Sequence, residues 1–209
     1  MAFENESLQS FSEALASKQS VPGGGGAAAY AGSLAAALGQ MVLAFTIGKP
    51  KYEPDRAILE ECCEKLEAAR KALLEAIDKD AEAFEPLSKA YGMPKSTPEE
   101  EAHRNEVMAV CLKNAAEAPL SIVETCAAMA PVLKTVSEKG SPIMRSDAGC
   151  AALLFKAAMV CGAMNVMINT RLMKDKDTAA AINDKMTTAM NAASPVFESI
   201  ADRIMESLK

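Results

Sequence analysis

The stretch Ser20-Val21-Pro22-Gly23-Gly24-Gly25-Gly26 leads directly into residues 27–47, a long run of small and apolar residues. Four consecutive glycines carry no Cβ atoms and permit positive φ, so their main-chain N–H groups can converge on a ligand. The start of a helix also presents unpaired N–H donors and the positive end of the helix dipole, which suit an anion or a polar ring. The sequence therefore predicts a binding loop that opens a helix.

The predicted helix over residues 27–47 is uncharged, as is the whole segment from Gln19 to Gly48. Small residues recur at every fourth position, at Ala28, Gly32 and Ala36, which lets two helix backbones approach closely. We expect this helix to be buried on nearly every side at the centre of the fold. One alternative is that the glycines serve packing alone and bind nothing.

A membrane span is a second alternative, because about 20 apolar residues cross a bilayer. Against it, the first half of the segment is rich in Ala, Gly and Ser, Gln40 lies inside it, and no other segment is expected to partner it in lipid. Two nucleotide-binding motifs are excluded. No Gly-Lys-Ser/Thr follows the glycines, as a P-loop requires, and no strand precedes them, as a dinucleotide fingerprint requires.

The composition favours tightly packed helices over sheets. Half of the 209 residues are hydrophobic, yet the chain has only six Phe, three Tyr and no Trp. The net charge of −6 disfavours general attraction to nucleic acid. The acidic start of the chain lacks an apolar signal region, so we expect a cytoplasmic protein.

Cysteine and histidine usage limits the possible chemistry. The six cysteines form no CxxC pair and lie in helical patterns, so we expect reduced, buried side chains. His103 is the only histidine and falls in a charged, exposed helix opening. It leaves little basis for a histidine metal cluster or a Ser-His-Asp triad, and we expect no metal site.

The hydrophobic pattern predicts one all-α domain, a helical bundle that spans residues 1–209. Thr97, followed by Pro98 and Glu100, is a typical capped helix start. We expect Pro119 to interrupt that helix and Gly140 to end the one after it. The predicted helices cover residues 6–18, 27–47 and 55–89, two segments between Thr97 and Gly140, residues 147–173, and a last segment from Thr178.

Asp80 is the most informative single residue. On a helix over residues 55–89 it lies near the centre of an apolar stripe, whereas Asp78 and Glu82 point elsewhere. A buried carboxylate must be paired, protonated or functional. Asp80 is therefore either a core aspartate bonded to a neighbouring helix or a general acid or base. The stripe consists of Leu59, Cys62, Leu66, Ala69, Leu73, Ile77 and Phe84.

Polar residues also interrupt the largely apolar helix over residues 147–173. Asp147, Asn165 and Asn169 share one face of it. The two amides indicate either a buried polar site or hydrogen bonds between helices. Asp147 and Asn165 are about 27 Å apart on an ideal helix, so they are not expected to grip the same small group.

Several motifs together resemble the cyclodeaminase/cyclohydrolase family of folate enzymes. Besides the glycine run, the matching motifs are Thr46-Ile47-Gly48-Lys49, Lys79-Asp80-Ala81-Glu82-Ala83-Phe84, Met93-Pro94-Lys95, Arg145-Ser146-Asp147 and Asn165-Val166-Met167-Ile168-Asn169. The resemblance implies an all-helical homodimer that acts on tetrahydrofolate one-carbon derivatives without a metal or redox cofactor, and no nucleic-acid or membrane partner is expected.

The resemblance also implies particular activities and residues. The chain lacks a transferase domain and carries Gly26-Ala27 where fused enzymes typically have Ser-Val, so it looks more like stand-alone methenyltetrahydrofolate cyclohydrolases than formimidoyltetrahydrofolate cyclodeaminases. A folate-binding protein without catalysis is a further alternative. Asp80 is the expected catalytic residue. The candidate substrate-binding residues are Gly23, Gly24, Gly25, Gly26, Lys49, Lys51, Lys95, Arg145, Asp147, Asn165 and Asn169, the four cations being candidate partners for the glutamate carboxylates.

Overall fold

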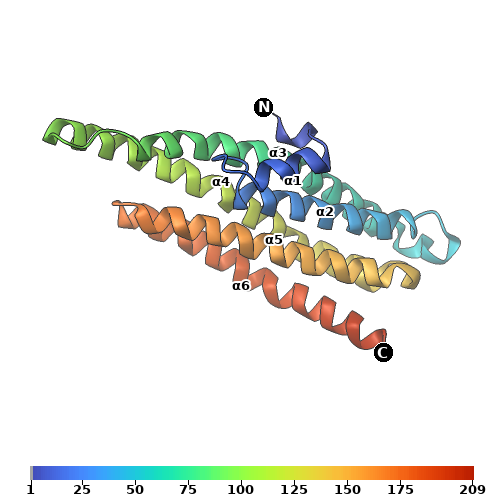
Figure 1. Cartoon of the computed structure of the whole chain (residues 1–209). Helices are drawn as coiled ribbons and strands as arrows, with labels where there is room; N and C mark the ends of the chain where they lie inside the picture. The colour runs from blue at the N-terminus through green and yellow to red at the C-terminus, as the bar shows by residue number, and fades with distance from the viewer. Residues whose placement is uncertain (1) are drawn as a thin grey trace.

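The computed structural model describes residues 2–209, which form helices and contain no strand. This confirms the predicted all-α class. In chain order the elements are η1 (Phe3–Asn5), α1 (Leu8–Leu15), α2 (Gly24–Ala44), η2 (Pro50–Asp55), α3 (Arg56–Tyr91), α4 (Pro98–Lys139), η3 (Pro142–Met144), α5 (Arg145–Leu172) and α6 (Lys176–Ser207) (Figure 1).

The five long helices lie side by side, and each runs opposite to the one before it (Figure 1). Helix α2 packs against α3 and α5, whereas α4 packs against α2, α3, α5 and α6. The buried apolar residues form one cluster that extends from Phe3 to Ile204. The antiparallel order places η2 and the start of α5 at one end of the bundle and the α3–α4 and α5–α6 turns at the other (Figure 1).

Helix α2 shows the close packing that its small residues predict. A Cβ atom on Gly32 would lie 3.0 Å from Sγ of Cys126, and one on Gly39 would lie 2.9 Å from Cδ1 of Leu66. The expectation that this helix is buried on nearly every side is wrong for the single chain, because Leu34 and Phe45 are 43% and 52% exposed. Helix α2 therefore keeps one outer face.

The predicted break at Pro119 is also wrong, because α4 continues through both Pro119 and Pro131. A proline inside a helix leaves the carbonyl four residues earlier without its N–H donor. For Pro119 that carbonyl belongs to Ala115, and Nδ2 of Asn169 on α5 donates to it at 2.7 Å. A side chain from a neighbouring helix therefore replaces the missing backbone hydrogen bond.

Other helix boundaries follow local capping chemistry. The capping box of Thr97 and Glu100 is present at the start of α4, and Gly140 ends that helix, as predicted. Helix α5 begins at Arg145, directly after η3, without a side-chain cap. Helix α6 also begins earlier than expected, because the side chain of Asp175 accepts hydrogen bonds from the N–H groups of Asp177 and Thr178.

Three helices are long and apolar enough to cross a membrane by length and composition: α2, α4 and the segment Pro142–Leu172. The expectation that no other segment could accompany residues 27–47 in lipid is therefore wrong. The apolar character of α5 arises partly from an outer face that one chain leaves uncovered, with Leu153, Met164 and Ile168 more than half exposed. What covers this face is considered below.

The cysteines only partly match the prediction. All six are free thiols, and Cys62, Cys111 and Cys126 are buried. Cys150 and Cys161 are exposed on α5, so the expectation that all six are buried is wrong. Helical periodicity places a residue on a face, and on α5 an outward face is as apolar as an inward one.

Candidate active site

A pocket of about 140 Å³ lies where the start of α2 meets α3, α4 and α5. It combines apolar walls with a few polar groups, which is typical of small-molecule sites. It brings together four of the residues predicted from the sequence, Gly23, Gly24, Asp80 and Asn165, and a fifth, Asn169. The remaining lining residues are Ser20, Val21, Phe84, Ala115 and Ile168.

Asp80 is the only ionisable residue among those that line this pocket. Burial raises the pKa of its carboxyl group to about 6, although a hydrogen bond from the backbone N–H of Gly26 acts in the opposite direction. A carboxyl group with a pKa near 6 exchanges protons readily close to neutral pH, as a general acid or base must. Its local surroundings therefore suit proton transfer.

Two of the four glycines, Gly25 and Gly26, contact the Asp80 carboxyl group and do not line the pocket. A Cβ atom on Gly25 would overlap the Asp80 carboxyl group, and Gly26 donates its N–H to that group. Gly25 and Gly26 are buried and do not line the pocket, whereas Gly23 and Gly24 do. None of the four has a positive φ; among residues 2–209 only Gly48 does. The run therefore provides room for a carboxyl group at the N-terminus of α2.

The two asparagines of α5 differ in their surroundings. Asn169 is buried, and its Nδ2 donates to the carbonyls of Ala115 and Asn165. Asn165 is partly exposed, and its Nδ2 donates within its own helix to the carbonyl of Cys161. Asn169 thus makes the hydrogen bond between helices that was one of its two expected roles. The Oδ1 of Asn165 also lies close to Gly24, where an added Cβ would be 3.3 Å away.

Phe84 and Ile168 are pocket residues that the sequence reasoning did not select as site residues. Phe84 lies one helical turn after Asp80, in the apolar stripe that was interpreted as core. Ile168 is 54% exposed and lines the pocket. The apolar periodicity of α5 gave no reason to select it as a site residue. Both are flanked by selected residues one turn or less away, and that proximity was the available signal.

The predicted cations lie far from this pocket within one chain. Lys49 and Lys51 precede α3, and the stretch of α3 from Arg56 to Asp80 is roughly 36 Å long at 1.5 Å per residue. Arg145 and Asp147 begin α5, about 27 Å or more from Asn165 by the same measure. Lys95 follows α3, whose stretch from Asp80 to Tyr91 is roughly 16 Å long. Within one chain these residues therefore do not line the pocket that contains Asp80, and their role in substrate binding stays a prediction.

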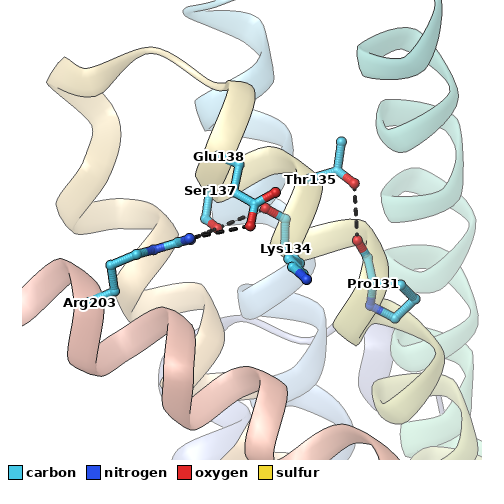
Figure 2. Close-up of polar contacts among 6 residues, drawn as sticks. All are labelled: Pro131, Lys134, Thr135, Ser137, Glu138 and Arg203. Carbon is cyan, nitrogen blue, oxygen red and sulfur yellow. Dashed lines mark hydrogen bonds and ion pairs between the residues drawn. The ribbon is translucent and has the colours of Figure 1, made fainter.

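A second surface pocket, of about 190 Å³, lies between α4 and α6. Its arginine already has protein partners: Arg203 donates to Oγ of Ser137 at 2.7 Å and to Oε1 of Glu138 at 3.3 Å (Figure 2). Lys134 lines the same pocket. The pocket at the start of α2 contains a largely buried carboxyl group with a raised pKa, so it is the stronger candidate for chemistry.

Histidine and metal-ligand chemistry are not prominent features of the described chain. His103 is exposed on the first turns of α4, as predicted. Among residues 2–209, no group of three or more His, Cys, Asp or Glu side chains is arranged to hold a metal ion.

The fold and the sequence both match known proteins. A family model described as formiminotransferase-cyclodeaminase matches residues 7–188. The chain therefore belongs to the formiminotransferase-cyclodeaminase family, which confirms the resemblance inferred from the motifs. A solved structure of formiminotetrahydrofolate cyclodeaminase from Thermotoga maritima has a TM-score of 0.86 and 29% sequence identity, and covers 98% of each chain.

Two kinds of characterised relative are similar to this chain. A methenyltetrahydrofolate cyclohydrolase of Methylorubrum extorquens is 41% identical over 172 residues, covering 82% of this chain and 83% of the relative. The formimidoyltransferase-cyclodeaminase of Gallus gallus is 32% identical over 186 residues, which is 89% of this chain but 34% of that protein. The chain thus corresponds to about a third of the longer animal protein.

Proposed function

We propose that this protein is a methenyltetrahydrofolate cyclohydrolase, which hydrolyses 5,10-methenyltetrahydrofolate to 10-formyltetrahydrofolate. The observation that carries the proposal is the half-buried Asp80, with its pKa of about 6, in a pocket between four helices. The relative from Methylorubrum extorquens, which matches this chain over most of both lengths, supports the same activity.

The proposed mechanism needs one proton-transferring group. The ionised Asp80 carboxylate takes a proton from water while the water oxygen bonds to the amidinium carbon between N5 and N10. The protonated carboxyl group then returns the proton to N5 as the carbon–N5 bond breaks. The hydroxyl proton of the adduct leaves to solvent, and the carbon remains on N10 as a formyl group. Water and Asp80 suffice, so the proposal includes no metal or redox cofactor.

A cyclodeaminase activity is the second candidate, favoured by the Thermotoga maritima structure that matches the whole chain. In that reaction N10 would attack the formimino carbon, and the N10 proton would pass to the imino nitrogen. Protonated Asp80 would then give its proton to the resulting amino group as the carbon–nitrogen bond breaks and ammonia leaves. A pKa of about 6 leaves both protonation states accessible near neutral pH, so the Asp80 environment suits either reaction.

One pair of assays separates these activities. Loss of the absorbance of methenyltetrahydrofolate reports the cyclohydrolase, and ammonia release from 5-formimidoyltetrahydrofolate reports the cyclodeaminase. We expect enzyme-dependent hydrolysis of the methenyl compound that exceeds its spontaneous rate. Activity on the formimino compound alone would replace the first candidate with the second. Tight folate binding without either activity would indicate a folate-binding protein that is not an enzyme.

The proposal also includes a homodimer in the cytoplasm. The outer faces of α2 and α5 carry exposed large apolar side chains, including Leu34, Phe45 and Leu153. Exposed apolar surfaces of this kind are typical of sites of association. A solution mass of two chains in the absence of detergent supports the dimer, and a single-chain mass at micromolar concentration contradicts it.

A further inference from the structure

Arg104, in the second turn of α4, has a buried polar atom that the protein leaves unsatisfied. Its Nε is the only buried side-chain nitrogen or oxygen atom among residues 2–209 that has no hydrogen-bond partner. None of the ion pairs that these residues form includes Arg104. A buried polar group without a partner costs free energy, and native proteins contain few of them. A guanidinium group has only donors, so the partner that it lacks is an acceptor.

The carboxylates one turn before Arg104 do not satisfy it. Glu100 is held in the capping box of α4, where its Oε2 accepts hydrogen bonds from the N–H groups of Ser96 at 2.8 Å and Thr97 at 3.2 Å. Glu101 is exposed to solvent and is not paired with Arg104. The acceptor that would satisfy Arg104 is therefore not supplied by its own helix.

Arg104 lies on the face of α4 that forms part of the candidate active site. It precedes Ala115, which lines the pocket, by eleven residues. On an α-helix this spacing places two side chains about 20° apart around the axis and roughly 16 Å apart along it. The prolines inside α4, Pro119 and Pro131, both lie beyond Ala115, so neither bends the helix between the two positions. Arg104 and the pocket are therefore on the same side of α4.

Helix α5 does not extend far enough to cover Arg104. The hydrogen bond from Asn169 to the carbonyl of Ala115 sets these two residues level with each other, and α5 ends three residues later, at Leu172. Because α4 and α5 are antiparallel, Arg104 lies roughly 12 Å beyond the end of α5. Figure 1 shows the same feature, since the α3–α4 turn extends past the α5–α6 turn. Arg104 is accordingly partly exposed, although its Nε is buried.

The pocket does not enclose a whole folate, an argument that rests on the proposed function. Its volume of about 140 Å³ is below the roughly 300–1,000 Å³ of most small-molecule sites, and no lysine or arginine is among its described lining residues. A folate continues from its reacting carbon through a p-aminobenzoyl ring to a glutamate with two carboxylates. This tail, when extended, spans about three to four residue lengths, or roughly 10–14 Å. The tail and an arginine side chain together can bridge the roughly 16 Å between Ala115 and Arg104.

We propose that Arg104 binds the glutamate carboxylates of the substrate and makes the site selective for folates that carry this negative charge. In this assignment the reacting carbon lies at Asp80, the p-aminobenzoyl ring passes Phe84, and a carboxylate accepts hydrogen bonds from Arg104. The planar guanidinium group matches a carboxylate with two parallel hydrogen bonds. Arg104 is not one of the four cations selected from the sequence as candidate partners for the glutamate.

A folate without carboxylates tests this assignment by binding alone. We would titrate the protein by calorimetry with 5-formyltetrahydrofolate, a chemically stable folate, and with its α,γ-diamide, in which both glutamate carboxylates are neutral amides. Arg104→Gln should weaken binding of 5-formyltetrahydrofolate by roughly 10- to 100-fold, as expected for loss of hydrogen bonds to a charged group. The diamide should bind wild type and variant equally well.

The matched control is Arg203→Gln on α6. It also removes one guanidinium group, but Arg203 already has protein partners, Ser137 and Glu138, at the second pocket. This variant should bind 5-formyltetrahydrofolate as the wild-type protein does. An equal loss of affinity in both variants would mean that the general charge of the protein matters and not Arg104, which would contradict the assignment.

Steady-state kinetics separates binding from chemistry. Arg104 does not line the pocket that contains Asp80, so it does not touch the reacting atoms. Arg104→Gln should therefore raise KM for methenyltetrahydrofolate by a factor similar to the loss of affinity and keep kcat within about threefold of wild type. A lower kcat with an unchanged KM would contradict a role in binding the tail.

The stability of the free protein distinguishes a binding role from a structural one. Arg104→Met keeps an unbranched side chain for packing and removes the unsatisfied buried donor. The melting temperature of the free protein should therefore stay the same or rise, whereas the increase in melting temperature on adding 5-formyltetrahydrofolate should become smaller. A lower melting temperature of the free variant together with an unchanged increase on adding the folate would show that Arg104 is structural.

The outcomes also separate this inference from the proposed function. Equal affinity of wild type and Arg104→Gln for 5-formyltetrahydrofolate, an equal loss with the diamide, or no binding of either compound to wild type would overturn the role of Arg104. If the wild-type protein is inactive on both folate substrates, the proposed function is wrong. The calorimetry with the folate and its diamide would still report whether Arg104 binds the carboxylates.

Discussion

The carboxyl group of Asp80 occupies the space that a side chain on Gly25 would fill, and the next residue, Gly26, donates its N–H to the same group. Two segments more than fifty residues apart in the sequence therefore meet at one proton-transferring group. The contact joins the N-terminus of α2 to the middle of α3. It fixes where the acidic proton of this pocket lies.

Gly25→Ala should displace the Asp80 carboxyl group. The added methyl group would overlap that carboxyl group, and the backbone around α2 is too closely packed to yield freely. We expect turnover to fall by roughly 10- to 100-fold, as misplacement of a catalytic group typically causes. The measurement is steady-state hydrolysis with circular dichroism as a fold check. Gly92→Ala, where a Cβ meets only an ordinary 3.5 Å contact, is the control and should keep activity.

Asp80→Asn should keep the fold and folate binding but lose most turnover. The amide is nearly the same size as the carboxyl group but cannot accept and return a proton at neutral pH. Loss of a positioned acid–base group costs on the order of 10²–10⁴-fold. Stopped-assay turnover and folate titration measure the two effects separately. Normal turnover in this variant would show that Asp80 is structural.

The control for that variant is Asp202→Asn on the exposed side of α6. Asp78, although it is close to Asp80 in the sequence, is unsuitable as a control. Asp78 has a structural role, because its Oδ1 accepts a hydrogen bond from the N–H of Phe3 at 2.7 Å. Asp78→Asn should therefore loosen the N-terminal segment and lower the stability by about 1–2 kcal/mol. Thermal melting and hydrogen exchange of residues 2–15 measure this. Unchanged exchange would mean that the contact contributes nothing.

The pH dependence of the cyclohydrolase should show a break near pH 6. Hydrolysis needs ionised Asp80, whose pKa is about 6, so kcat/KM should fall about tenfold per pH unit below that value. The stability should change in the opposite sense. The folded-state pKa of Asp80 is raised above its ordinary value of 3.8, so Asp80 disfavours folding increasingly as pH rises from about 4 to 6.

Asp80→Asn tests this linkage at pH 8, because the amide stays neutral. The variant should be more stable than wild type by up to about 3 kcal/mol at that pH and should show little difference at pH 3.5. Denaturant titrations at the two values measure the difference. Equal stability at pH 8 would contradict a raised pKa.

Gly32→Leu should force α2 away from its neighbours. Even a Cβ atom there would lie 3.0 Å from Sγ of Cys126 and 3.1 Å from Cδ1 of Leu73. Overpacking of this kind costs roughly 1–3 kcal/mol or more. Differential scanning calorimetry should show a lower melting temperature, whereas Ala192→Leu, on an exposed position of α6, should not. An unchanged Tm for Gly32→Leu would argue against close packing at that residue.

Local patterns predicted the helices and the neighbourhood of Asp80 because helix formation and burial follow from a residue's own periodicity. The stripe around Asp80 is one example, and the capping box at Thr97 is another. Local patterns could not predict which residue packs against Asp80, because nothing in the spacing of α3 indicates that Gly25 lies opposite it. The positions of Lys49 and Arg145 relative to Asp80 were beyond that reasoning too. Shared motifs indicate a shared site, but not which copy of the chain supplies each residue.

The hydrogen bond that Pro119 cannot make sets the longitudinal position of α5. Because the carbonyl of Ala115 is free of its usual donor, it accepts Nδ2 of Asn169, and it can do so at only one position along the groove. If α5 moved along its axis by one residue, about 1.5 Å, the hydrogen bond between the Asn169 amide and the Ala115 carbonyl would break, and both buried groups would be unsatisfied. The proline in α4 therefore fixes the position of α5 along the bundle axis. As a result Asn165 stays beside Gly24 at the pocket.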